Sequence, residues 1–360
     1  MPSNKAQAVH IFKMVDNMTE FMNEALIICP SFNKKWKINK YKDYYNLHTK
    51  KKIKITSIFK ELRLNNIINR LIYGFQVAFK LKNEKNLIVS RSLITSFFLI
   101  LFKVQHFLEI HQELKGLTKL IFINLKFANS KYLTKVIFIS KGLSNFYRLN
   151  SKKYLILHDG CDLRDFKNKR KIRKKIKNIY YMGSFYKGRG IEIIMNLSKL
   201  TPEFNYYLYG LRDEKIKSFR NFNVFPIVSY KKTLKIVNNA DLLLMPYQSK
   251  VSINSKNFND DISKFISPLK MFEYLATGIP IISSNLNVLR EILSNKKNSI
   301  LVKNYSDPVA WKKAINLLSN NFPLRKNISK NAYLTSIKNT WNIRSKRIYE
   351  VYKQNKNHLN

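Results

Sequence analysis

Short apolar runs alternate with helical segments along this chain, and no other feature limits its fold as strongly. Such alternation is typical of parallel βα units, whose strands are buried on both faces. No sequence repeat of solenoid period accompanies it. The pattern therefore predicts an open, doubly wound α/β sheet in each half of the chain. The predicted strands are residues 25–29, 87–90, 106–111, 136–140, 154–157, 179–182, 206–210, 224–228 and 241–246.

The length predicts two domains, because one ordinary hydrophobic core seldom holds 360 residues. Hydrophobic residues make up 45% of the chain, which is enough for two packed cores and argues against disorder. We place the boundary near His158. Between the first two strands, residues 31–65 are rich in lysine and tyrosine without a clear period, and we expect surface loops and short strands there.

The charge is strongly positive, with 66 lysines and arginines against 22 acidic residues and a formal net charge of +44. This excess favours nucleic acid or an anionic membrane face, where each nearby cation adds about 1 kcal/mol. Codon drift in an AT-rich genome would give the same abundance of lysine, asparagine and isoleucine. Composition alone leaves these explanations open, but the sequence has no helix-turn-helix, RNA-recognition or zinc motif.

Cysteine use and hydropathy predict a cytoplasmic protein. Cys29 and Cys161 are the only cysteines, so neither a disulfide framework nor a zinc site is indicated. The first residues have no apolar segment typical of a signal peptide. The longest uncharged apolar stretch, residues 92–102, is shorter than the roughly 20 residues of a spanning helix. We therefore expect any membrane contact to be peripheral, at the inner face of the cytoplasmic membrane.

The segment 267–280 encodes a helix with both ends marked. Ser267 is a good N-cap, Pro268 suits the first helical position, and Gly278 suits a left-handed C-terminal position before Pro280. We therefore predict a helix over residues 268–277. Because a strand and a loop lead into it, its free N–H groups should face the crevice at the sheet edge, where they could bind phosphate.

This helix has one polar stripe, formed by Lys270, Glu273 and Thr277. Such a face could offer a cation to a diphosphate and a carboxylate to a sugar diol. An ordinary surface helix with a solvated Lys–Glu pair has the same spacing, so the spacing alone leaves both interpretations open.

Residues 267–291 resemble the donor-site signature of the group 1 (family 4) retaining glycosyltransferases. The resemblance implies that Glu273 binds the ribose hydroxyls of a nucleotide-sugar donor. It also implies that the helix start holds the donor's phosphates. The residues of that helix start are Ser267, Pro268, Leu269 and Lys270.

The resemblance extends over residues 3–355, more firmly in the C-terminal half. Residues 158–162 resemble the family's hinge-side turn, and residues 181–192 resemble its phosphate loop, which assigns Gly183, Ser184 and Arg189 to donor binding. In the first half, residues 109–111 resemble a strand-end motif whose histidine, here His111, faces the transferred sugar. A lone strand-end histidine is otherwise more often a packing residue.

Further similarities to the family lie in a turn, a loop and the last helix, outside the donor site. Residues 139–143 resemble a neighbouring turn with a structural role, and residues 2–6 resemble the loop after the family's first strand. Trp341 and Arg344 resemble a segment of the last helix that crosses back to the first domain.

The resemblance implies a GT-B fold, in which two Rossmann-like doubly wound domains face a central cleft. Residues 1–158 would form the acceptor-side domain, residues 159–338 the domain that binds the nucleotide sugar, and residues 339–360 the returning helix. Since the chain begins where the family's first strand has already ended, we expect the N-terminal domain to lack that strand.

Two positions depart from the family's donor site. Ser184 stands where an arginine is frequent, with Arg189 at the neighbouring lysine position. Phe265 occupies the first slot of a carboxylate pair of which Glu273 is the second, and we expect Lys270 to compensate in part.

The expected activity is transfer of a sugar from a UDP- or GDP-linked donor to an acceptor hydroxyl, with retention, in surface polysaccharide or lipopolysaccharide synthesis. We expect His111, Arg189 and Lys270 to serve catalysis, without cofactor or metal, because Asp260 and Asp261 are weak candidates for a metal site. The expected partners are the donor, a saccharide or lipid-linked acceptor and an anionic membrane, with no specific nucleic acid. Two alternatives are a basic nucleic-acid or anionic-surface binder without activity and a GT-B nucleotide-sugar epimerase.

Overall fold

The computed structural model describes residue 3 and residues 6–33, 35–58, 66–124, 126–166, 172–210, 216–253 and 261–357. Pro2, Asn4, Lys5 and Asp260, which the sequence analysis names, lie outside these residues. Within the described residues, no helix combines the length and apolarity needed to cross a membrane.

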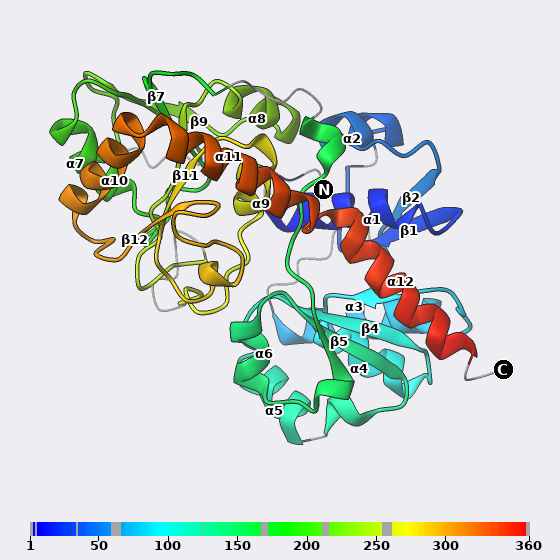
Figure 1. Ribbon diagram of the computed structural model, residues 1–360. Coiled ribbons are helices and arrows are strands. Elements are labelled where there is room, and N and C mark those ends of the chain that lie inside the picture. The colour runs from blue at the N-terminus through cyan, green and yellow to red at the C-terminus, as the bar shows by residue number, and fades with distance from the viewer. Residues whose placement is uncertain are drawn as a thin grey trace.

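Among the described residues, the C-terminal lobe is built on one parallel sheet of six strands, in the order β12-β11-β10-β7-β8-β9 (Figure 1). Its central strand β10 is buried at every position, as expected for a strand covered by helices on both faces. The strands are β7 Asn178–Met182, β8 Asn205–Gly210, β9 Phe222–Pro226, β10 Leu242–Met245, β11 Ile281–Ser284 and β12 Ile300–Val302. The helices are α7 Ile191–Leu200, α8 Tyr230–Val237, α9 Leu269–Thr277, α10 Pro308–Asn320 and α11 Phe322–Ile337.

The strands of the N-terminal lobe form two separate parallel sheets, β1-β2 and β3-β4-β5-β6. Figure 1 shows β1 and β2 with α1 and α2 at the upper right, apart from the larger sheet below. The strands are β1 Glu24–Ile28, β2 Lys52–Thr56, β3 Val89–Ser90, β4 His106–Ile110, β5 Leu133–Phe138 and β6 Tyr154–Ile156. The helices are α1 Ala6–Met18, α2 Ile38–Tyr44, α3 Ile67–Lys80, α4 Leu93–Leu101, α5 Gly116–Asn124 and α6 Lys141–Tyr147.

The smaller sheet and its helices share a hydrophobic core with the C-terminal lobe. Phe12 of α1 and Tyr45 after α2 stack at 4.1 Å between ring centroids and belong to the same buried cluster as Phe272 of α9. The larger sheet has its own core, which includes Val136 and Phe138 of β5. The predicted domain boundaries at residues 158 and 338 stay a prediction.

The chain passes between the lobes twice, and the two passages run side by side. The amide of Cys161 donates to the carbonyl of Asn339 at 3.1 Å, and the amide of Trp341 donates back to Cys161 at 3.0 Å. Helix α12 Trp341–Asn357 then lies along the N-terminal lobe (Figure 1). A Cβ on Gly160 would come within 2.7 Å of the Trp341 amide nitrogen, so this close approach requires glycine.

Two local predictions are wrong. Residues 31–65 contain helix α2 in addition to strand β2. Helix α9 begins at Leu269, with Pro268 rather than Ser267 at its cap position. The Ser267 hydroxyl instead accepts a hydrogen bond from the Asp159 amide at 3.1 Å, so it links the helix start to the interlobe passage. Gly278 has the left-handed conformation predicted for the helix end, with φ of 69°.

Candidate functional site

Lys270, in the first turn of α9, carries a buried ammonium without a hydrogen-bond partner among the described residues. Its Nζ lies 3.9 Å from the ring centroid of Tyr181 and 5.4 Å from that of Tyr247. Burial holds the pKa of Lys270 well below its usual range, and the nearby Arg189 guanidinium lowers it further. Aromatic faces compensate only part of the cost of burying a cation.

Gly183 leaves space for this ammonium. It follows β7 with φ of 145°, a conformation that favours glycine. A Cβ at this position would come within 2.6 Å of the Lys270 Nζ. Any larger residue would therefore displace the cation.

Arg189 is the second cation of the site. Its Nη2 donates to the Ser252 carbonyl at 3.3 Å, and its guanidinium lies 5.3 Å from the centroid of Tyr247. The Nε of Arg189 is buried without a partner. No described carboxylate forms an ion pair with Arg189 or Lys270, and Glu273 affects Lys270 only through an electrostatic attraction that raises its pKa.

Glu273 lies on the same helix and points to a different environment. It is hydrogen-bonded to Tyr230, and burial raises its pKa to about 7. The Tyr230 hydroxyl also donates to Asp165 Oδ2 at 3.1 Å. Glu273 therefore binds its proton more tightly than an exposed carboxylate does.

A chain of contacts joins Glu273 to the N-terminal lobe. Lys13 of α1 is fully buried, and its Nζ lies 2.8 Å from Asp165 Oδ2 and 2.7 Å from the Asn46 carbonyl. His48 Nε2 lies 2.7 Å from the other oxygen of Asp165. The sequence analysis missed this network, although a lysine on the apolar side of a helix is an unusual pattern that could have indicated it.

The other predicted donor residues have mainly structural contacts. The Ser184 carbonyl accepts a hydrogen bond from the Tyr181 hydroxyl at 2.8 Å, and the Pro268 carbonyl accepts one from Met271 at 2.9 Å. Leu269 packs against an N-terminal-lobe cluster that includes Trp341. The structure thus brings Gly183, Arg189 and Lys270 together, while Ser267 and Leu269 attach α9 to the first lobe.

Phe265 stands at the position where the resemblance leads us to expect the first carboxylate of the pair with Glu273, and its contacts account for the difference. Its buried ring packs into the core of the N-terminal lobe, 5.7 Å from the ring of Phe146. Its carbonyl accepts a hydrogen bond from Ser140 at 3.1 Å. A carboxylate in this apolar contact would be buried without a partner, so this slot serves the contact between lobes.

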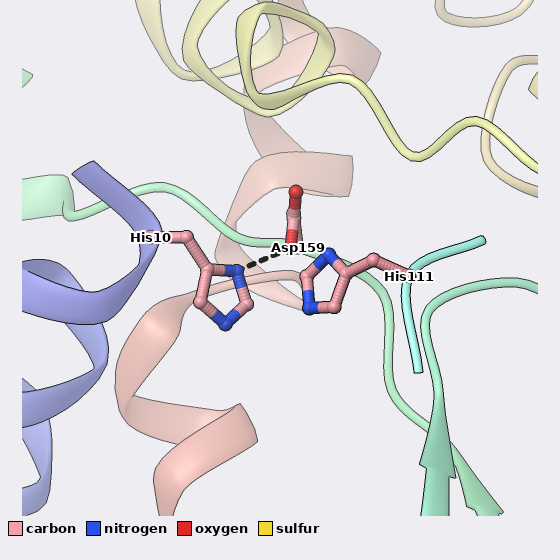
Figure 2. Close-up of side chains that lie close together, drawn as sticks. All are labelled: His10, His111 and Asp159. Atoms are coloured by element: carbon pink, nitrogen blue, oxygen red, sulfur yellow. Dashed lines mark hydrogen bonds and ion pairs between the residues drawn. The ribbon is translucent and has the colours of Figure 1, made fainter. Parts of the chain in front are cut away.

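His111 belongs to a second charged cluster, in the N-terminal lobe and the passage between lobes (Figure 2). His10 of α1 stands between two carboxylates: its Nδ1 lies 2.8 Å from Asp159 Oδ1, and its Nε2 lies 2.8 Å from Glu109 Oε1. His111 contacts the same oxygen of Glu109, and its ring meets that of His10 edge to face at 4.8 Å. The sequence analysis named His111 but not His10, whose position within an apolar helix gave the only signal.

Cationic and acidic side chains meet in the second cluster. Arg344 of α12 lies 3.3 Å from Glu109 Oε2. Burial alone would raise the pKa of Glu109, but Arg344 and the two histidines hold that pKa well below its usual range. Burial, with a contribution from Arg91, lowers the pKa of His111 to about 4. His111 is therefore neutral at neutral pH and can both donate and accept hydrogen bonds.

The nitrogen and oxygen atoms of His10, His111 and Asp159 lie within 4.8 Å of one another, as do those of His48, Asp162 and Asp165. These distances alone would permit a metal ion. Yet each group of three already forms ion pairs, and arginines stand beside both. Metal independence therefore stays a prediction.

Comparison with known proteins defines the class of the fold. Residues 162–335 match the family described as "Glycosyl transferases group 1". A search of curated proteins found no match. The fold is GT-B, with α/β lobes built on parallel sheets, because known glycosyltransferases of this architecture superimpose on the chain over nearly its full length.

Three solved structures show this similarity. A glycosyltransferase from Rickettsia africae ESF-5 has a TM-score of 0.72 at 14% identity, covering 98% of this chain and 96% of that one. Anabaena Alr3699/HepE, solved with UDP-glucose, has a TM-score of 0.71 at 10% identity, covering 98% and 97%. Sucrose-phosphate synthase from Thermosynechococcus elongatus has a TM-score of 0.70 at 12% identity, covering 97% and 93%.

Proposed function

We propose that this protein is a retaining glycosyltransferase that moves a sugar from a nucleoside diphosphate to an acceptor hydroxyl. The observation that carries the proposal is the unpaired, buried ammonium of Lys270 beside Arg189 and Gly183. A diphosphate would supply an anionic partner for this pair. The family match includes all three residues, and HepE of the same fold was solved with UDP-glucose.

In the proposed reaction, the bond between the anomeric carbon and the diphosphate oxygen breaks as the acceptor oxygen bonds to that carbon. The diphosphate leaves with the electron pair, so negative charge develops on it, and its leaving oxygen accepts the proton that the acceptor hydroxyl loses on the same face of the sugar. Lys270 and Arg189 would stabilise this charge, and one well-placed donor is typically worth ~3 kcal/mol of barrier. The binding of phosphate would also raise the lowered pKa of Lys270, because an adjacent anion favours the ammonium.

The remaining residues would position the donor. Glu273 would accept hydrogen bonds from the ribose, exchanging its bond with Tyr230 for bonds to the ligand. His111 would bind the transferred sugar from the other lobe as a neutral imidazole. Since these groups belong to different lobes, closure of the lobes would complete the site.

The proposed setting is surface polysaccharide or lipopolysaccharide synthesis at the inner face of the cytoplasmic membrane. The net charge of +44 supports attraction to anionic lipid. The donor would carry UDP or GDP, and no metal or other cofactor would be required. The comparisons favour neither the epimerase alternative nor a nucleic-acid binder.

A thermal-shift screen tests this function. UDP, GDP, ADP and their sugars are compared, with duplex DNA as a control at the same ionic strength. We expect one nucleotide and its sugar to raise the melting temperature by several degrees, since a ligand at 100 times its Kd adds about 2.7 kcal/mol of stability. Stabilisation by DNA alone would contradict the proposal.

A further inference from the structure

Helix α3 exposes a stripe of large apolar residues, which we call the α3 ridge. Its members are Ile68, Leu71, Ile72, Phe75 and Phe79, with 63% of Ile68 and 49% of Phe79 exposed. Their spacing places them along one face of the helix. The opposite face, with Tyr73 and Val77, is buried in the lobe. An amphipathic surface helix normally has polar residues on its solvent-exposed face. Helix α3 differs, because its exposed face is apolar as well.

The ridge continues onto α4 through aromatic contacts. The ring of Phe75 lies 5.5 Å from that of Phe98 and 5.6 Å from that of Phe102, and Phe79 lies 6.0 Å from Phe102. Leu101, next to Phe102, is 57% exposed. The apolar surface is thus a continuous one supported by two packed helices, not a set of scattered side chains.

The segments that form this apolar surface and follow it are rich in exposed cations. Between residues 66 and 104 the only acidic residue is Glu84. The Lys82 Nζ lies 4.1 Å from the ring centroid of Phe79, so its charge stands directly at the edge of the ridge. The exposed cations of α3 and of the segments after α3 and α4 are Arg70, Lys80, Lys82, Lys85 and Lys103.

We infer that the α3 ridge docks on an anionic lipid surface, with its apolar side chains among the acyl chains and its lysines at the headgroups. This rests on the proposed membrane association and names the surface responsible for it. Apolar area and electrostatic attraction to anionic lipid add together in such binding. A second copy of the chain fits less well, because a symmetric contact would bring the two sets of cations together.

Sedimentation with vesicles tests the inference. The vesicles contain phosphatidylglycerol and phosphatidylethanolamine, with pure phosphatidylcholine vesicles for comparison. We expect binding to the anionic vesicles that falls as salt rises, because screening shortens the reach of the lysines. The double variant Ile68→Ser/Ile72→Ser should bind on the order of tenfold or more weakly, since two side chains no longer enter the apolar layer. Lys80→Gln/Lys82→Gln should lose about fivefold per lysine.

A matched control comes from the other lobe. Leu334 and Ile337 of α11 are 45% and 40% exposed, and Leu334→Ser/Ile337→Ser should bind the vesicles like the wild type. The melting temperature of each variant shows whether it is folded, and nucleotide titration shows whether it still binds the donor. If the wild type binds vesicles but no nucleotide, the proposed function is wrong while the inference about the α3 ridge is supported.

Equal vesicle binding by the wild type and the Ile68→Ser/Ile72→Ser variant would overturn the inference, as would an equal loss in the control. The gel-filtration volume of each variant is measured in parallel. If the ridge variant loses self-association and keeps its vesicle binding, the ridge belongs to a contact between copies and the inference is wrong.

Discussion

The two charged clusters of this protein differ in how their charges are compensated. In the N-terminal lobe, His10 stands between Asp159 and Glu109, and Arg344 completes the set. In the C-terminal lobe, Lys270 and Arg189 lie near each other without a described carboxylate partner. Both clusters are buried, yet among the described residues only the first contains ion pairs between its cationic and acidic side chains.

We propose that this difference reflects two roles: the unpaired cluster binds the anionic part of a ligand, whereas the paired cluster stabilises the contact between lobes and presents His111. A buried charge costs several kcal/mol unless it is paired, so a paired cluster can be explained by the fold alone. An unpaired buried cation lowers stability and is retained for another reason, of which a bound anion is the simplest. The two clusters are also connected, because the Asp159 amide donates to the Ser267 hydroxyl just before α9.

The largest expected effect follows from breaking the paired cluster. Arg344→Leu removes the guanidinium from Glu109 and leaves a buried carboxylate with less compensation. The free energy of unfolding should fall by ~3–5 kcal/mol, the usual cost of removing one partner of a buried ion pair. Urea unfolding followed by circular dichroism measures this, and a loss below about 1 kcal/mol would show that the cluster is not a stabilising unit.

The next effect concerns the unpaired cluster and has the opposite sign for stability. Lys270→Met replaces the ammonium by an apolar chain of similar length, so the ligand-free protein should be as stable as the wild type or more stable. The barrier to sugar transfer should rise by ~3 kcal/mol, which slows turnover roughly a hundredfold. The test measures initial rates with the donor that binds, together with the free energy of unfolding. If the Lys270→Met variant is less stable than the wild type and keeps full turnover, Lys270 is a structural residue and the proposed role of this cluster is wrong.

A smaller effect is expected at the ribose. Glu273→Gln keeps the shape of the side chain and removes its charge, so hydrogen bonds to the ribose should weaken by roughly 1 to 2 kcal/mol. Affinity for the nucleoside and for the nucleoside diphosphate should both fall about tenfold.

Arg189→Ala, by contrast, should lower turnover more than it weakens donor binding, because it removes a positive charge from the place where negative charge develops on the leaving group. Identical behaviour of the two variants would argue against these separate roles.

The pH dependence should also differ between the clusters. Burial raises the pKa of Glu273 to about 7, so its carboxylate forms as pH rises through 7 and nucleotide affinity should increase from pH 6 to 8. Burial lowers the pKa of His111 to about 4. It does the same to the pKa of His106 at the start of β4, which belongs to neither cluster, so both histidines bind fewer protons than the unfolded chain below pH 6.5. Stability should therefore fall as pH drops from 6.5 toward 4. Glu273→Gln should abolish the first dependence and leave the second.

The sequence could predict the features that depend on local sequence patterns. Buried strands such as β10 and the glycine at the end of α9 follow from hydropathy and backbone preference. The resemblance also brought Arg189, Lys270 and Gly183 into one loop-and-helix region, and the structure does place them together.

What the sequence could not predict depends on contacts between distant segments. His10 and Lys13 find their partners beyond residue 100 of the chain, which no local spacing reveals. Ser267 has the chemistry of an N-cap, but Asp159 competes for its hydroxyl. The exposed apolar face of α3 was also not predicted, because the sequence of an apolar helix indicates burial unless its neighbouring elements are known.

The most direct test is titration calorimetry of the wild type and Lys270→Met with UDP, GDP and the corresponding nucleosides. If the unpaired cations hold a diphosphate, one nucleotide should bind the wild type, and the variant should bind it at least about tenfold more weakly. The variant's affinity for the nucleoside, which has no phosphate, should not change. Equal nucleotide affinity in the two proteins, or no binding of either nucleotide to the wild type, would contradict the account.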